Sequence, residues 1–208
     1  MKARILVWLV ALFCCHNVLF AQKEFVNASA RLSGHPRILL QKGEEKALKK
    51  VIMKDAVWKD IHQSLVDEAG EIVKLPLNER IKTGRRLLSV SRENLRRIFI
   101  LSYAYRMTGK NEFLKRAESE MLKAASFSDW NPSHFLDVGE MTMALAIGYD
   151  WLYPQLSVQT KKEIENAIVE KGLKPSFDER YNWFVNAVHN WSQVCHAGVT
   201  YGALAIWE

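Results

Sequence analysis

Cysteine is scarce in this sequence of 208 residues, which contains only Cys14, Cys15 and Cys195. The first two lie near the N-terminus, in a segment that we expect to be removed. The single thiol that remains cannot form a disulfide within its own chain. The sequence therefore excludes a small domain stabilised by disulfides, and the fold must rest on its hydrophobic core.

The N-terminal segment is organised like a secretory signal peptide. Lys2 and Arg4 precede an apolar run at residues 5–15, which is too short to cross a bilayer. Ala21 then offers a small side chain at which a signal peptidase can cut. We predict that residues 1–21 are a signal peptide and that the mature protein is periplasmic or secreted, with no stable membrane insertion once the signal is removed.

No part of the sequence concentrates charge of one sign. The formal net charge is +6, and removing Lys2 and Arg4 with the signal peptide lowers it to about +4. Basic residues are interspersed with acidic ones, unlike the basic stripe of a nucleic-acid-binding surface. We expect no nucleic-acid partner. A modest positive charge favours an acidic partner, but it is also ordinary for a soluble protein.

Strand patterns are lacking too, because no alternating β-branched runs with hairpin turns occur. Apolar residues recur instead at helical spacing through the whole mature sequence. The expected boundaries are a stop near Pro76, a cap at Ser91, an end at Gly109, an end at Pro154, a cap at Ser157, an end at Gly172 and a last helix that begins near Asn190. The stripe formed by Trp58, Ile61, Leu65, Ala69 and Ile72 is expected to be buried. The sequence predicts an all-α fold.

Short loops between such helices predict antiparallel helical hairpins. Strict sequence repeats, which would indicate a solenoid, are not found, so a ring of paired helices is favoured. The last helix reaches Glu208 without a glycine, asparagine or proline stop, and residues 204–207 have the pattern of buried positions. We therefore expect residues 22–208 to be the N-terminal part of an incomplete (α/α) toroid that continues beyond Glu208.

Polar groups gather at the start of the last expected helix, in the stretch "HNWSQVCHAGVTYGALAIWE". His189, then Ser192 or Gln193, then His196 and Thr200 are spaced to share one helical face. Small residues on the other side, among them Gly198, allow a neighbouring helix to approach closely. Free backbone N–H groups at such a helix start favour an anion. A substrate with a carboxylate would suit this position.

Each of these residues also has a purely structural interpretation. His189 suits an exposed loop and Asn190 a helix cap. Trp191 suits a hydrophobic core as well as a sugar-stacking site, and Cys195 is more typical of a buried thiol than of a nucleophile. The histidine and cysteine spacing does not match a zinc site, so no metal or other cofactor is expected within this sequence.

Two further groups remain open. Asp137 and Glu140 stand one helical turn apart and fit either an acid pair or a solvated or capping face. Arg85 and Arg86 fit either contacts with acidic ligand groups or plain exposure to water.

Several stretches resemble heparinase II/III-like polysaccharide lyases. They are "HPRILL" (residues 35–40), "RRLLSVSRENLRRIFILSYAYRMTG" (residues 85–109), "MALAIGYDWLYPQLS" (residues 143–157) and the final stretch from His189. The resemblance covers the mature sequence in order. It implies an N-terminal (α/α) toroid followed by β-sandwich sheets, and cleavage of uronate-containing polysaccharide of the heparin, heparan sulfate or alginate type by β-elimination.

The resemblance also implies site residues. His189 matches a catalytic histidine of heparinase-II-like members, although Ser192 stands where those members carry glutamate. Asn190 matches the asparagine that neutralises the uronate carboxylate in heparinase-III-like and alginate-lyase-like members. Trp191, Gln193 and His196 are expected to bind substrate. The family's catalytic tyrosine and second histidine would lie beyond Glu208.

The function expected from these observations is that of an exported polysaccharide lyase with an acidic polysaccharide as its partner, and residues 1–208 alone are expected to be inactive. Two alternatives remain open. One is an (α/α)-ring glycoside hydrolase such as an unsaturated uronyl hydrolase, which needs two carboxylates facing one cavity. The other is a non-catalytic sugar-binding helical domain.

Overall fold

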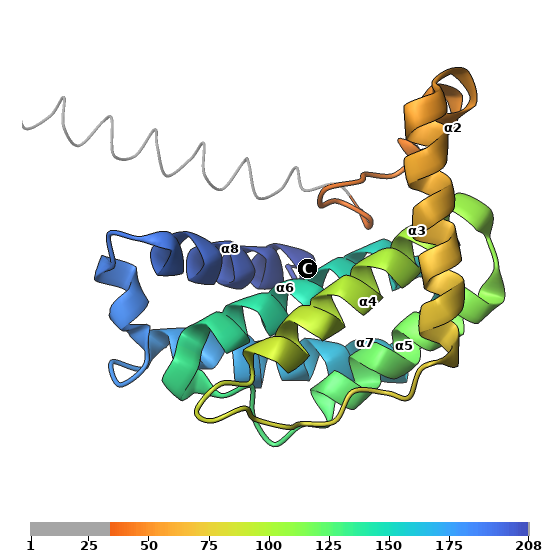
Figure 1. Cartoon of the computed structure of the whole chain (residues 1–208). Coiled ribbons are helices and arrows are strands. Elements are labelled where there is room, and N and C mark those ends of the chain that lie inside the picture. Colours follow the sequence, from red (N-terminus) through yellow and green to blue (C-terminus); the bar gives the residue numbers. More distant parts are fainter. Residues whose placement is uncertain (1–33, 208) are drawn as a thin grey trace, which may run out of the picture. The chain divides into compact units, whose positions relative to one another are not determined.

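The structure, a computed structural model, describes residues 34–207, so the expected signal peptide at residues 1–21 lies outside it. Within this range there are helices and no β-strand, apart from one isolated bridge between Thr83 and Arg86. The expected all-α fold is confirmed for this part of the chain. The α-helices are α2 (Glu45–Lys54), α3 (Ala56–Lys74), α4 (Leu88–Thr108), α5 (Asn111–Ala125), α6 (Phe135–Leu152), α7 (Val158–Ala167) and α8 (Asn190–Ala205) (Figure 1).

Short 3-10 or π-helical segments connect several of these helices. They are η1 (Pro132–His134), η2 (Tyr153–Gln155), the π-helical η3 (Ile168–Leu173), η4 (Lys174–Phe177) and η5 (Asn182–Asn186). None of the helices in residues 34–207 combines the length and the apolar character needed to cross a bilayer.

Helices α4 and α6 pack side by side and run in the same direction. The backbone N–H of Leu87, just before α4, donates to Asp137 in the first turn of α6. Towards the other end, a Cβ placed on Gly148 of α6 would lie 2.6 Å from the side chain of Ile98 of α4. From the first contact to the second, the residue number rises in α4 and in α6 alike. The two helices are therefore parallel and begin at the same end (Figure 1).

Helix α8 packs on α6 in the same parallel sense. A Cβ on Gly198 of α8 would lie 2.1 Å from the carbonyl oxygen of Gly139 of α6, and a Cβ on Gly202 would lie 2.6 Å from Thr142. Only glycine allows the two backbones to meet at Gly198. The expectation that small residues let a neighbouring helix approach closely is confirmed, and α4, α6 and α8 form one parallel layer.

A second layer contains α5, α7 and η3. Glu118 of α5 accepts a hydrogen bond from Thr160 of α7 at 2.7 Å, and the Lys171 ammonium of η3 donates to the carbonyl oxygens of Ala125 and Phe127. Here too the residue number rises in both elements from one contact to the next, so α5 and α7–η3 are parallel to each other. Only two residues separate α4 from α5, which returns antiparallel to it, as expected for a helical hairpin.

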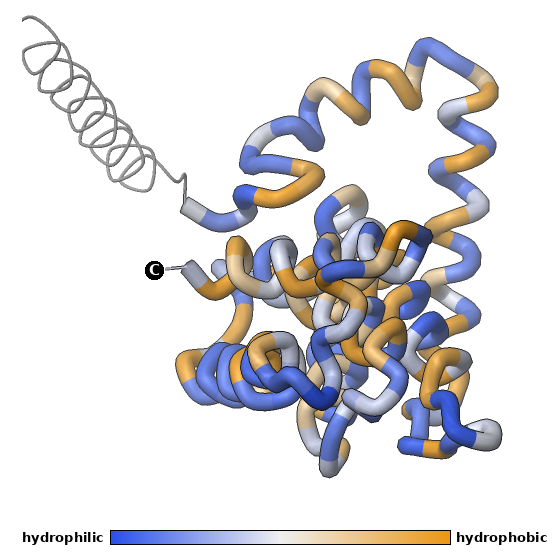
Figure 2. Tube along the Cα trace, turned by 90° about the vertical axis from the view of Figure 1, so that its left-hand side faces the viewer, coloured by the Kyte–Doolittle hydropathy of each residue, from blue (hydrophilic) through white to orange (hydrophobic). Residues whose placement is uncertain are grey.

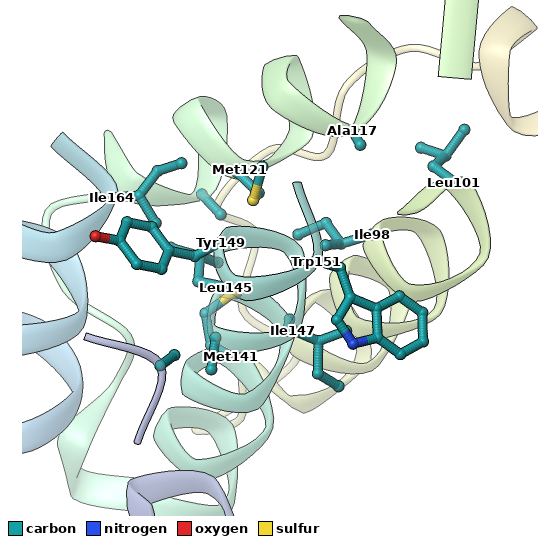
Figure 3. Packing of buried hydrophobic residues seen from close by; sticks show 14 of the residues in the cluster. Ile98, Leu101, Ala117, Met121, Met141, Leu145, Ile147, Tyr149, Trp151 and Ile164 are labelled. Carbon is teal, nitrogen blue, oxygen red and sulfur yellow. The ribbon is translucent and has the colours of Figure 1, made fainter. Parts of the chain in front are cut away.

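Helix α6 is the centre of the hydrophobic core. All of its residues except Glu140 and Met143 are buried. Figure 3 shows its side chains packed against Ile98 of α4, Met121 of α5 and Ile164 of α7. An apolar helix without a polar face needs neighbours on all sides, and the two layers together supply them.

Helices α2 and α3 form an arm whose outer part has few neighbours, and Figure 2 shows apolar and polar residues interspersed along it. The predicted stripe on α3 is buried only in part. Ala69 and Ile72 are fully buried, whereas Trp58 and Ile61 are each 47% exposed. The prediction was wrong for the first half of α3, where His62 contacts Tyr103 of α4 but Trp58 and Ile61 remain largely uncovered.

Some predicted helix boundaries are confirmed. Gly109 ends α4 in the left-handed conformation with φ 74°, and the Ser157 hydroxyl caps α7 by accepting from the backbone N–H of Thr160. The prediction at Ser91 was wrong. Helix α4 begins one turn earlier, at Leu88, and Ser91 is buried inside it.

Two expectations about chain segments near the C-terminus also need correction. The helix expected to end at Gly172 continues as η3, and a Cβ there would lie 2.6 Å from Thr142, so Gly172 provides a close contact and not a stop. Of residues 204–207, Ala205 is buried but Trp207 is 46% exposed.

Candidate functional site

The parallel layer brings the N-terminal ends of α4, α6 and α8 to one end of the described unit (Figure 1). The polar residues singled out in the sequence lie on or beside these ends. Each helix start presents backbone N–H groups and the positive end of its dipole. The buried Asp137 carboxylate lies at the starts of α4 and α6, and the start of α8 is the one left favourable for an anionic ligand in the described residues.

His189 and Asn190 are both exposed at the start of α8. His189 is the N-cap, and its Nδ1 accepts the backbone N–H of Trp191 at 3.4 Å. The capping role weighed for Asn190 therefore belongs to His189, and Asn190 is the first helical residue. Its amide has no hydrogen-bond partner among residues 34–207 and remains available to a ligand.

The exposed face of α8 has the residues expected from its spacing. Gln193, His196 and Thr200 are exposed or partly exposed, in line with His189. His196 Nδ1 lies 2.6 Å from the carbonyl oxygen of Ser192 and donates to it. The polar face is thus present, and the roles expected for Gln193 and His196 in substrate binding remain predictions.

Trp191 is only partly exposed, because other rings surround it. The ring of Trp183, on η5, lies 4.6 Å from it at an interplanar angle of 37°. The ring of His134 meets it edge-on at 4.7 Å. Trp183 also lies 6.1 Å from the His189 ring. Trp191 therefore joins the start of α6 to η5, and it is Trp183 that carries the more exposed indole of the pair.

Asp137 is fully buried and accepts three hydrogen bonds. The donors are the backbone N–H of Leu87 at 2.6 Å, the side-chain amide of Asn131 at 2.6 Å and Nδ1 of His134 at 2.7 Å. Asn131 reaches it from a left-handed backbone conformation, φ 59°. With its oxygens engaged in this way, Asp137 serves to hold the starts of α4 and α6 together.

Glu140, one turn further along α6, differs from Asp137. Its carboxylate receives the Arg92 Nε–H at 3.1 Å, and its side chain is 11% exposed. Burial raises the pKa of Glu140, and the hydrogen bond from Arg92 opposes this rise. Asp137 and Glu140 thus lie on the same helix, but Asp137 is fully buried with three donors and Glu140 is slightly exposed with Arg92 as its donor.

Cys195 is a buried free thiol, as expected. Burial, with a smaller contribution from the negative charge of Glu140, raises the pKa of Cys195 to about 12. A thiol of this pKa stays protonated at neutral pH, so Cys195 is unsuited to act as a nucleophile.

Arg85 and Arg86 are exposed in the turn before α4. The backbone fixes this turn, because the Asn131 amide donates to the carbonyl oxygen of Arg85 at 2.8 Å and Arg86 pairs with Thr83. Both arginines therefore stand at the same end as His189 and Asn190, and their exposure is compatible with either interpretation of the pair.

A metal site is not found in the part of the chain that the structure describes. Among residues 34–207, no group of three or more His, Cys, Asp or Glu side chains is arranged to hold a metal ion.

Sequence reasoning missed His134 and Trp183 as parts of this arrangement. Both lie outside the helical stripes, His134 in the turn before α6 and Trp183 in the irregular segment before α8. The only signal was the Trp-Asn-Pro turn at residues 130–132, which indicates a fixed loop and not a site.

Comparison with known proteins adds no assignment. No protein-family model matches the chain, and no curated protein matches it. The function proposed below therefore rests on the sequence patterns and on the geometry of the site.

Proposed function

We propose that this protein is an exported polysaccharide lyase that cleaves uronate-containing polysaccharide by β-elimination. The observation that carries the proposal is the pair His189 and Asn190, exposed together at the start of a helix whose backbone is locked against α6. A locked helix holds catalytic groups in a fixed geometry, which this chemistry requires.

The proposed fold is one arc of an (α/α) toroid. In such a ring, alternate helices belong to an inner and an outer layer, and the helices within each layer are parallel. The parallel sets α4–α6–α8 and α5–α7 support this arrangement. The resemblance to heparinase II/III-like lyases belongs to the same proposal.

In β-elimination a base removes the proton on C5 of the uronate, a C4–C5 double bond forms, and the glycosidic oxygen leaves C4 as an acid protonates it. The carboxylate must be neutralised, because the negative charge that develops on it would otherwise oppose loss of the proton. In the proposal, the Asn190 amide donates to this carboxylate, together with the positive helix start. His189 stabilises the charge through its Nε2–H, or acts as base once its Nδ1 releases the Trp191 N–H.

The hydrolase alternative has less support. It needs two carboxylates that face one cavity, and Asp137 and Glu140 were the candidate pair. Asp137 is fully buried with three donors on its oxygens, and Glu140 is engaged by Arg92. Neither is placed as a free acid beside an open space.

The test is turnover by the full-length natural protein. Heparin, heparan sulfate and alginate are offered to the wild type and to Asn190→Ala, and the unsaturated uronate product is followed by its near-ultraviolet absorbance. We expect product with the wild type and a loss of about a hundredfold or more in kcat for the variant, since removing one charge-stabilising donor has an effect of this order.

The matched control is Asn166→Ala, which removes an exposed asparagine from α7, far along the chain from this helix start. It should retain the wild-type rate. Absence of the absorbance rise with wild type on all three polymers would refute the lyase proposal, and a fully active Asn190→Ala would refute the role of the amide. In the first case, saccharide binding without turnover would favour the sugar-binding alternative.

A further inference from the structure

Trp183 presents an indole ring that is 46% exposed beside the start of α8. One side of the ring packs on Trp191 at 4.6 Å, and the His189 ring is 6.1 Å away. The exposed part of this indole offers a flat apolar face that is suited to stacking.

A series of contacts connects the Trp183 ring, through Trp191, to the buried core. Trp191 meets His134 edge-on at 4.7 Å, and Nδ1 of His134 donates to the fully buried carboxylate of Asp137 at 2.7 Å. The Asp137 carboxylate, in turn, is fixed by donors from the turns before α4 and α6. The exposed ring of Trp183 is thereby tied to the rigid core, although η5 itself is a short 3-10 segment.

We infer that Trp183 is a stacking platform for a pyranose ring of the saccharide, in a subsite next to the one served by His189 and Asn190. The inference rests on the proposed function. The C–H groups on one face of a pyranose pack on an aromatic ring. The hydroxyl and carboxylate groups at the edge of the pyranose need polar partners. His189 and Asn190 supply such partners on the side towards α8, and a ring fixed in advance loses little entropy on binding.

The competing interpretation is a protein-docking patch, because Val185 and Val188 nearby are also exposed, at 49% and 101%. The saccharide is favoured for two reasons. The indole is supported by further rings, and the exposed ring beside it, that of His189 at 6.1 Å, is a polar imidazole.

The experiment compares Trp183→Ala and Trp183→Phe in the complete natural protein, with Trp58→Ala as the matched control. Trp58 is also about half exposed but lies on α3. We expect Trp183→Ala to raise KM for the cleaved polymer about tenfold with kcat within about twofold of wild type, because stacking contributes to ground-state and transition-state binding alike. Trp183→Phe should retain most of the affinity, and Trp58→Ala all of it.

Binding is measured separately from turnover, in the Asn190→Ala background, by titrating tryptophan fluorescence with heparin and with alginate. The same Trp183→Ala change should weaken binding about tenfold there. Cleavage with an unchanged KM would overturn the platform while leaving the lyase intact. Trp183-dependent binding without cleavage would overturn the lyase and retain the platform. A Trp183→Ala variant that changes only the oligomeric state in size-exclusion chromatography would overturn the platform in favour of a protein interface.

Discussion

Glu93 of α4 is bound by two arginines of its own helix. Its carboxylate accepts from Arg96 at 2.7 and 2.9 Å and from Arg97 at 2.7 Å. The hydrogen bonds from Arg96, more than any other cause, lower the pKa of Glu93 to about 2 against the burial that would raise it. A carboxyl whose pKa is lower in the folded state stabilises the fold only while it is ionised.

We therefore predict that Glu93→Gln lowers the free energy of unfolding by about 1–2 kcal/mol at pH 7, since the side chain is partly screened by solvent. The difference from wild type should be complete above about pH 4.5 and disappear as the pH falls towards about 2. Urea unfolding at several pH values measures it. Glu71→Gln is the control, because Glu71 pairs with Lys74 on an exposed surface and should change stability by less than about 0.5 kcal/mol. A difference that does not vary with pH would contradict the assignment to this carboxylate.

Residues with a local role were the easiest to predict from the sequence. Gly109 and Ser157 act within one turn of the chain, and their chemistry alone indicates a helix end and a helix cap. Ser91 has the same chemistry as Ser157, but the preceding turn is already drawn into α4 by the bond from Leu87 to Asp137. That bond joins residues 50 positions apart, which no local pattern can indicate.

At the scale of helices, the contact between α6 and α8 decides where the site residues stand. The two helices meet at Gly139 and Gly198 with no side chain between them. The small residues of α8 predicted a close approach but not its partner or its parallel direction. Both follow from packing between helices that are not neighbours in sequence.

Gly198→Ala tests this contact. The new Cβ would lie 2.1 Å from the Gly139 carbonyl oxygen, and backbone cannot move aside as a flexible side chain does. We predict a loss of about 3 kcal/mol in the free energy of unfolding, together with displacement of the start of α8. Chemical denaturation measures the first, and the turnover assay reports the second.

Gly70→Ala on α3 is the opposite case and the control. No atom lies within 4 Å of the position where its Cβ would stand, and the backbone is helical. Alanine should raise stability there by about 0.5–1 kcal/mol, because it favours the helix over the unfolded chain. Equal effects of the two substitutions would show that α6 and α8 are not in backbone contact.

At the scale of the whole described unit, Asp150 near the end of α6 holds the segment at residues 35–38. Its buried carboxylate accepts from the backbone N–H groups of Arg37 and Ile38 at 2.9–3.0 Å and from His35 Nδ1 at 2.6 Å. This segment lies more than 100 positions before Asp150 in the sequence and packs at the C-terminal end of α6, opposite the candidate site. The resemblance in "HPRILL" marked this segment in the sequence, but its partner was not predictable.

We predict that Asp150→Asn frees this segment and leaves the helical layers folded. The amide can replace only one of the two acceptor oxygens, so at least one backbone donor faces an N–H group. Hydrogen exchange followed by mass spectrometry should show the amides of Arg37 and Ile38 exchanging about tenfold faster or more, with those of α4 and α6 unchanged. Asp178→Asn, in an exposed pair with Arg180, is the control. Faster exchange throughout α6 would show instead that Asp150 supports the core as a whole.

The burial of α6 has a consequence for how the molecule is made. One partner of this helix, α4, precedes it in the chain, and the other, α8, is synthesised last of the three. While the chain grows from its N-terminus, a nearly uniformly apolar helix therefore stays uncovered on one side until α8 has left the ribosome. The helix start that carries His189 and Asn190 is synthesised together with the surface that covers this side of α6, so the candidate site and this part of the core form together.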